Sequence, residues 1–112
     1  LQGLGTMNDA QFIEASRHLA ERAMREAGEE FNQRLDYVTT RLLARLFEDN
    51  ERALVRQTHQ ELLEMYRTDI DGATQLLNVG DSVSDPALPV PDSAAWTMLV
   101  SQLMNLDEVL NK

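Results

Sequence analysis

The 112-residue sequence predicts an all-α protein, a compact bundle of four to five helices with a long proline-containing loop before the last helix. Apolar residues recur at steps of three and four along most of the chain, and no segment alternates with a period of two over the length of a strand. Apolar residues make up 43% of the chain and aromatic residues only 5%, so Leu, Ala, Val and Met must form most of the core. That mixture favours helices. The length suits one domain spanning residues 1–112.

Residues 8–28 predict the first helix. Asn8 can cap its start with Gln11 as in a capping box, and Gly28 is suited to a left-handed stop. An apolar face is built from Phe12, Ala15, Ser16, Leu19, Ala23 and Ala27. The opposite face carries Glu14, Arg17, Glu21, Arg22, Arg25 and Glu26. We expect the charges on this second face to support one another by only tenths of a kcal/mol per pair.

The second and third helices are predicted on either side of residues 48–50. The second spans about residues 31–47, with an inward face of Leu35, Val38, Leu42, Leu46 and Phe47. Asp49 or Asn50 can cap a long third helix. The apolar stripe of the third helix consists of Val55, His59, Leu62, Tyr66 and Ile70.

Asp69 and Gly72 mark a point where the chain can cap a new helix, and residues 72–80 predict a short fourth helix ending at Gly80. Residues 80–92 then form the long loop, which prolines at positions 86, 89 and 91 stiffen. It can be a packed clasp, a ligand-binding loop or a mobile segment. The packed clasp is favoured because apolar residues alternate with the prolines, so that Val83, Leu88 and Val90 can pack against the helices.

The last helix is predicted from Ser93 to about Leu106, capped by Asp92. Its apolar positions are Ala95, Trp96, Leu99, Val100, Leu103 and Met104, which is typical of a helix buried on most of its circumference. Trp96 is therefore expected near the centre of the core. We interpret the following Asn105, Asp107 and Glu108 as structural: Asn105 can satisfy the last carbonyls, and Asp107 can cap a further turn.

Charge and cysteine content exclude several classes of partner. The net charge is −9, and residues 68–112 hold seven acidic residues against Lys112 alone. Nucleic acids and anionic membranes are bound by clusters of Lys and Arg, which this sequence concentrates nowhere, so we expect no nucleic-acid partner and no membrane insertion. The absence of cysteine rules out disulfides, thiolate metal sites and covalent attachment of c-type haem to this chain.

Reactive motifs are not found. The sequence contains no glycine-rich phosphate loop, nucleophile elbow or HExxH motif. His18 and His59 lack metal-ligand spacing and are interpreted as partly buried, hydrogen-bonded residues, and the five methionines as core residues. We therefore predict no catalytic, cofactor-binding or metal-binding residue. The positions retained for an interaction are Asp85, Trp96, Asn105, Asp107 and Glu108.

Several segments together resemble a known family. They are the Asn8-Asp9 helix start, Leu76-Leu77-x-Val79-Gly80, Asp85-Pro86-x-Leu88, Ala94-Ala95-Trp96-Thr97 and Asn105-Leu106-Asp107-Glu108. In these segments the chain resembles the C-terminal domain of unknown function of large planctomycete-type exported proteins that carry an N-terminal cytochrome c-like domain. The chain opens on Leu1, so we expect it to be a fragment of such a multidomain protein. The resemblance implies a periplasmic, cell-envelope or exported location, with haem c in another domain of the parent.

The absence of reactive motifs and the resemblance favour a non-catalytic structural or interaction module. Its expected partners are the other domains of the parent protein. The alternative is a small-ligand or glycan-binding accessory domain of a redox or polysaccharide-degrading enzyme, in which the long loop and Asp85 contact the ligand. The resemblance assigns no reaction to this domain.

Overall fold

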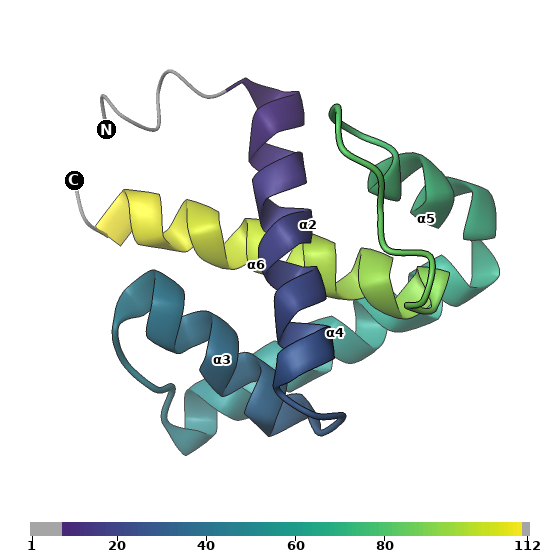
Figure 1. Cartoon of the computed structure of the whole chain (residues 1–112). Helices are drawn as coiled ribbons and strands as arrows, with labels where there is room; N and C mark the ends of the chain where they lie inside the picture. The colour runs from purple at the N-terminus through teal and green to yellow at the C-terminus, as the bar shows by residue number, and fades with distance from the viewer. Residues whose placement is uncertain (1–7, 111–112) are drawn as a thin grey trace.

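The computed structural model describes the backbone of residues 8–110 and the side chains of residues 8–106. Within this part the chain forms five helices and no strand (Figure 1). The helices are α2 (Asp9–Glu26), α3 (Phe31–Leu43), α4 (Asp49–Thr68), α5 (Ile70–Leu77) and α6 (Val90–Leu110). Residues 78–89, called here the 78–89 loop, connect α5 to α6. The predicted all-α bundle with a long loop before the last helix is confirmed.

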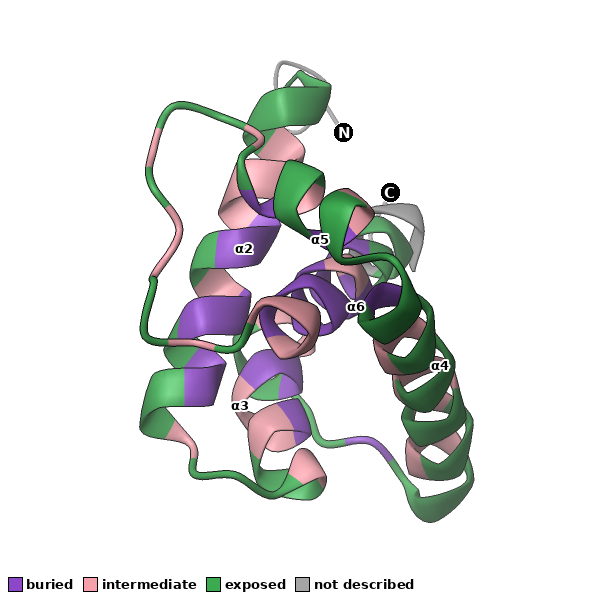
Figure 2. Ribbon diagram, turned by 90° about the vertical axis from the view of Figure 1, so that its right-hand side faces the viewer, coloured by how far each residue is buried: buried purple, intermediate pink, exposed green. Residues whose placement is uncertain are grey.

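The last helix is the centre of the bundle. Figure 2 shows α6 nearly end-on, with α2, α3, α4 and α5 around it, and each of the four contacts α6. Its buried positions are Ser93, Ala94, Ala95, Trp96, Thr97, Leu99, Val100, Ser101 and Leu103. Burial on most of the circumference of α6 agrees with the sequence prediction.

The core lies on two sides of α6. The larger cluster contains Trp96, which is only 1% exposed, together with residues of α2 and α3 such as Met24 and Leu35. The smaller cluster joins α4 and α5 to the start of α6 through Tyr66, Ala73, Leu77, Ala94 and Ala95. The predicted position of Trp96 at the centre of the core is therefore correct.

The first helix begins and ends as predicted. The Asn8 side chain accepts a hydrogen bond from the Gln11 amide at 2.7 Å, and the Gln11 side chain accepts one from the Asn8 amide at 3.0 Å. This reciprocal pair satisfies two amides that lack partners inside the helix. After the helix, Gly28 has φ +83°, the left-handed conformation that a residue with a side chain rarely adopts.

The second predicted helix is too long, because α3 ends at Leu43. Ala44 has φ +57°, which turns the chain out of the helix. The turn exposes 54% of Leu46, predicted to face inward, and places Phe47 in the core at 6% exposure. Burying a phenylalanine contributes roughly 1.5 to 3 kcal/mol, enough to offset a left-handed alanine, which costs about 1 to 2 kcal/mol.

The start of α4 also differs from the prediction. Glu48 is the capping residue, in place of Asp49 or Asn50, and its amide donates a hydrogen bond to the Glu51 side chain at 2.8 Å. At the other end the predicted capping point is confirmed, because the Asp69 side chain accepts a hydrogen bond from the Gly72 amide at 3.0 Å. The next helix, α5, begins at Ile70.

The last helix extends beyond the predicted range at both ends. The Pro89 carbonyl accepts a hydrogen bond from the Ser93 amide at 2.9 Å, so α6 begins at Val90 and Asp92 lies in its first turn. Pro91 is tolerated there because first-turn amides have no partner inside the helix. At the other end the α6 backbone continues past Leu106 to Leu110. The side chains of Asp107 and Glu108 lie outside the described residues.

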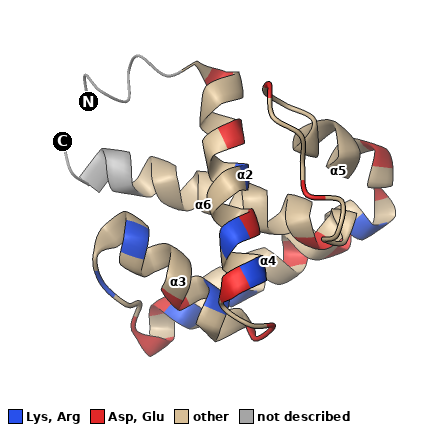
Figure 3. Ribbon diagram, viewed as in Figure 1, with Lys and Arg blue, Asp and Glu red and all other residues tan. Residues whose placement is uncertain are grey.

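Charges are distributed unevenly over the described residues. In Figure 3, both Arg and acidic residues are coloured along α2, α3 and α4, whereas the 78–89 loop and α5 carry acidic residues and no Lys or Arg. No helix in residues 8–110 is both long enough and apolar enough to cross a membrane.

Candidate functional site

A group of polar side chains joins α2 to the 78–89 loop. The α2–loop cluster consists of Glu14, Arg17, His18, Glu21, Arg25, Ser82 and Asp85. At its centre lies Arg17, which is 0% exposed. Its guanidinium donates to Glu21 Oε2 at 3.1 Å, to the Ser82 carbonyl at 2.9 Å and to the Val83 carbonyl at 3.3 Å. These contacts pair the buried charge, as an interior charge requires.

Ser82 and His18 lie as close as a nucleophile and its base, since Ser82 Oγ is 3.0 Å from His18 Nε2. The hydroxyl, however, donates its proton to Glu14 and accepts from Arg17 Nη2 at 2.7 Å. Hydrogen bonds from the Ser82 hydroxyl and amide lower the pKa of Glu14, which makes this carboxylate a weaker base. The hydrogen-bonding capacity of Ser82 is therefore taken up by its neighbours.

Asp85 is held on three sides. Its carboxylate forms an ion pair with Arg25 at 3.0 Å and accepts from the Ala87 amide at 2.9 Å, and its own amide donates to Glu21 at 2.9 Å. The Ala87 amide and the Arg25 guanidinium lower the pKa of the Asp85 carboxyl. Asp85 thus anchors the loop to α2, and these groups are occupied by the protein itself.

These contacts correct the prediction for the charged face of α2. Arg17 and Glu21 are buried under the loop, at 0% and 4% exposure, whereas their placement opposite the apolar face suggested solvated ion pairs. The loop is packed, as the favoured interpretation proposed, but polar groups hold much of it. Leu88 packs against the core, while Val83, expected to pack as well, is 89% exposed.

His59 lies in an aromatic group inside the bundle. Its ring centroid is 4.8 Å from that of Trp96 and 5.1 Å from that of Phe31. The buried Nε2 has no hydrogen-bond partner among the described residues, so the expected hydrogen bond is not formed at this atom. Burial lowers the pKa of His59 to about 4. His18, in contrast, is exposed beside Ser82.

No group of three His, Asp or Glu residues in the described part of the chain is arranged to hold a metal ion. The predicted methionine core is correct for Met24, but Met65 is 47% exposed. Met7 lies outside the described residues.

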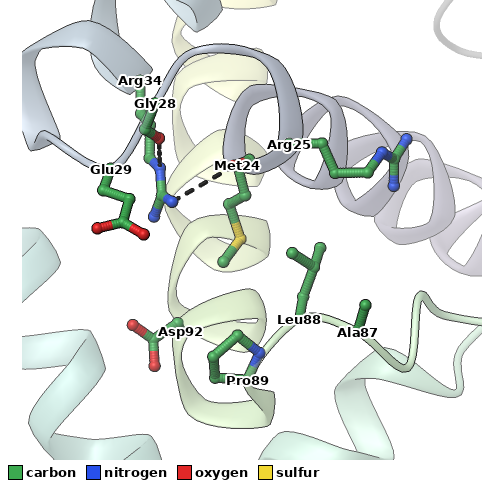
Figure 4. A pocket seen from close by; sticks show the side chains of 9 residues that line it. All are labelled: Met24, Arg25, Gly28, Glu29, Arg34, Ala87, Leu88, Pro89 and Asp92. Carbon is green, nitrogen blue, oxygen red and sulfur yellow. Dashed lines mark hydrogen bonds between the residues drawn. The ribbon is translucent and has the colours of Figure 1, made fainter.

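A pocket of about 550 Å³ opens between the end of α2 and the start of α6 (Figure 4). It is lined by Met24, Arg25, Gly28, Glu29, Arg34, Ala87, Leu88, Pro89 and Asp92. Its volume lies in the range of roughly 300 to 1,000 Å³ that is typical of small-molecule sites. The pocket could not be predicted from the sequence, because its walls come from segments that are separate along the chain.

Opposite charges line this pocket. The Arg34 guanidinium donates to the Gly28 carbonyl at 2.7 Å and to the Met24 carbonyl at 3.4 Å, which fixes its position. Glu29 and Asp92 supply two carboxylates, and neither forms an ion pair with a described residue. The Arg25 guanidinium points away from the pocket toward the loop, where Asp85 binds it.

The five positions retained from the sequence do not form one site. Asp85 belongs to the α2–loop cluster, Trp96 to the core, and Asn105 is exposed on α6. The side chains of Asp107 and Glu108 lie outside the described residues. No known protein family, curated protein or solved structure matches this chain.

Proposed function

We propose that this domain is a non-catalytic interaction module that binds another protein surface along α4. One observation carries the proposal: α4 fully buries only Tyr66, while Leu54 and Met65 are 67% and 47% exposed. Eleven residues, about three helical turns, separate Leu54 from Met65, so both lie on the same side of the helix.

Further apolar side chains lie at the two ends of α4. Leu46, just before the helix, is 54% exposed, and Ile70, just after it, is 48% exposed. A single exposed apolar residue is ordinary, but several on α4 and the residues that flank it are typical of a surface that another protein covers. Figure 2 shows α4 at the outer edge of the bundle, where a partner can reach it.

The charges beside this surface indicate the chemistry of the partner. Four exposed acidic residues, Glu61, Glu64, Asp69 and Asp71, lie around Met65 and Ile70, against one exposed basic residue, Arg67, so this end of α4 has a net negative charge. Electrostatic complementarity favours a partner that presents apolar side chains flanked by Lys or Arg. The family resemblance favours a neighbouring domain of the parent protein as the source of this surface.

The α2–loop cluster supports the non-catalytic part of the proposal. Its most reactive arrangement, Ser82 with His18, is occupied by hydrogen bonds to Glu14 and Arg17. A nucleophile needs a base that is free to accept its proton, whereas Glu14 already accepts the hydroxyl and amide hydrogens of Ser82.

The test is calorimetric binding between this domain and the remaining domains of the parent, produced as a separate chain. We expect Leu54→Asp and Met65→Asp each to weaken binding by about tenfold or more, because each places a charge on an apolar contact. Val83→Asp is the matched control, since Val83 is equally apolar and 89% exposed but lies on the loop. Absence of binding by the wild type, or equal weakening by Val83→Asp, contradicts the proposal.

A further inference from the structure

The pocket between α2 and α6 places the positive Arg34 and the negative Asp92 on different walls (Figure 4). Arg34 comes from the start of α3 and Asp92 from the first turn of α6. They do not form an ion pair with one another, although both line the same pocket. Because the two opposite charges do not pair with each other, a ligand that carries one negative and one positive group can bind both of them.

Arg34 is prepared to bind an anionic group. Its Nε and Nη2 atoms are held by the Gly28 and Met24 carbonyls, whereas Nη1 has no hydrogen-bond partner among the described residues. A guanidinium carries five N–H donors, so donors remain after these two contacts. Because the carbonyls already fix the side chain, binding a carboxylate here loses little conformational entropy.

The carboxylates of the pocket favour a cationic group. Neither Asp92 nor Glu29 has a hydrogen-bond or ion-pair partner through its carboxylate within the described residues, and Figure 4 shows Glu29 on the same side of the pocket as Arg34 and Asp92 on the opposite side. Arg25 does not offset them, since its guanidinium is bound to Asp85. Two carboxylates against one available guanidinium disfavour a simple anion and favour a ligand with an amino group.

The remaining walls are apolar. Met24 projects into the pocket beside Leu88 and Pro89 (Figure 4). A flexible thioether can adapt to ligands of different shape, while a proline wall stays fixed. An aliphatic group of moderate size can therefore lie between the two charged walls.

We propose that this pocket binds a small zwitterion, an α-amino acid with an apolar side chain. Its ammonium group pairs with Asp92, its carboxylate with Arg34, and its side chain packs on Met24 and Leu88. The site is separate from the apolar surface of α4, so this proposal stands independently of the protein interaction.

The test is a titration of the whole 112-residue chain with L-leucine, followed by amide NMR. We expect a Kd of about 1 mM or tighter, with the largest shifts at the amides of Gly28, Ala87 and Leu88. Two probes each carry half of the recognition: isoamylamine lacks the carboxylate and 4-methylpentanoate lacks the amine. Each half-probe should bind at least about tenfold more weakly than L-leucine.

Asp92→Asn tests the ammonium contact, with Asp71→Asn as its matched control. Both aspartates lie in the first turn of a helix, Asp92 in α6 and Asp71 in α5, but Asp71 is outside the pocket. We expect Asp92→Asn to weaken L-leucine binding about tenfold or more and Asp71→Asn to leave it unchanged. Unfolding measured without ligand separates lost binding from lost folding.

Three results overturn the proposal. The first is no shift of the pocket amides with L-leucine. The second is isoamylamine binding as tightly as L-leucine, which would leave Arg34 without a role. The third is an Asp92→Asn protein that folds normally and keeps wild-type affinity.

Discussion

The two sides of α2 are buried by different means. The side facing α6 contributes Ala20, Ala23 and Met24 to an apolar core, whereas the side facing the 78–89 loop buries Arg17 and Glu21 in a hydrogen-bonded cluster. The apolar side needs only small or flexible side chains that fit together. The charged side needs particular partners at particular atoms, since a buried charge without them is strongly destabilising. The same helix thus contributes to an apolar core, in which side chains can shift slightly, and to the α2–loop cluster, in which each polar atom needs its particular partner.

The largest expected effect lies on the apolar side. Trp96→Ala should lower the free energy of unfolding by about 3 to 5 kcal/mol, because it leaves a cavity beside Phe31 and His59. Urea denaturation followed by far-UV circular dichroism measures the loss. Leu54→Ala, at a 67% exposed position, is the control and should change stability by less than about 0.5 kcal/mol. A Trp96→Ala protein that unfolds like the wild type would contradict the core assignment.

The second prediction concerns the charged side. Arg17→Met keeps a long side chain but removes the guanidinium that pairs with the buried Glu21 carboxylate and donates to the Ser82 carbonyl, which should cost about 3 kcal/mol although Glu21 keeps its hydrogen bond from the Asp85 amide. Arg22→Met changes an exposed arginine on the same helix and should have little effect. Limited proteolysis adds a local measure, since the 78–89 loop should be cleaved faster in Arg17→Met than in Arg22→Met. Equal stability and equal cleavage of the two variants would show that the buried arginine does not hold the loop.

The buried imidazole of His59 makes the stability of the protein depend on pH. Burial lowers the pKa of His59 to about 4 in the folded protein, whereas the imidazole in the unfolded chain binds a proton near pH 6.5. The stability associated with neutral His59 is therefore complete above about pH 6.5 and is lost as the pH falls toward 4. Between about pH 7.5 and pH 4.5 the wild type should lose about 2 kcal/mol more than His59→Phe.

Two carboxylates of the α2–loop cluster, Glu14 and Asp85, titrate at lower pH than they do in the unfolded chain. Hydrogen bonds lower the pKa values of Glu14 and Asp85, so the stability they contribute is present above their ordinary pKa values and is lost only on further acidification. Urea denaturation at a series of pH values separates the two effects. If His59→Phe loses as much stability as the wild type above about pH 4.5, the histidine is not the group responsible.

The smallest expected effect compares two glycines. Gly28 and Gly80 both have left-handed backbones, with φ +83° and φ +96°. An alanine side chain costs about 1 to 2 kcal/mol in that conformation at either position. At Gly80 it would also meet the Glu14 side chain at 2.6 Å and displace it from Ser82, whereas at Gly28 it meets the flexible end of Gln33. Gly80→Ala should therefore be the more destabilising by thermal denaturation, and the reverse order would contradict the role of Glu14.

The helices and the Trp96 core could be predicted because apolar spacing depends on nearby residues. The Asn8 cap and the Asp69 capping point could be predicted for the same reason, since their partners lie three residues away. The end of α3 could not, because burial of Phe47 in the distant core decides where Ala44 turns the chain. The start of α6 was missed because Asp92 is also a strong capping residue.

The sites were less predictable than the fold. Spacing along α2 shows that Arg17 and Glu21 can pair, but it does not show that Ser82 of the distant loop covers them. The pocket presents the same difficulty, since Arg34 and Asp92 belong to helices far apart in sequence. The spacing of apolar residues identifies which face of a helix is apolar. Whether a polar face is buried depends on which distant segment of the chain packs against it.

The central claim is that polar groups of α2 hold the 78–89 loop in one arrangement. Hydrogen exchange of the loop amides tests it most directly, because the Ser82 amide donates to Glu14 at 2.6 Å and the Asp85 amide to Glu21 at 2.9 Å. We expect these two amides to exchange more slowly than those of Val83 and Ser84, which have no acceptor among the described residues. Exchange of Ser82 and Asp85 as fast as that of Val83 and Ser84 would contradict the claim.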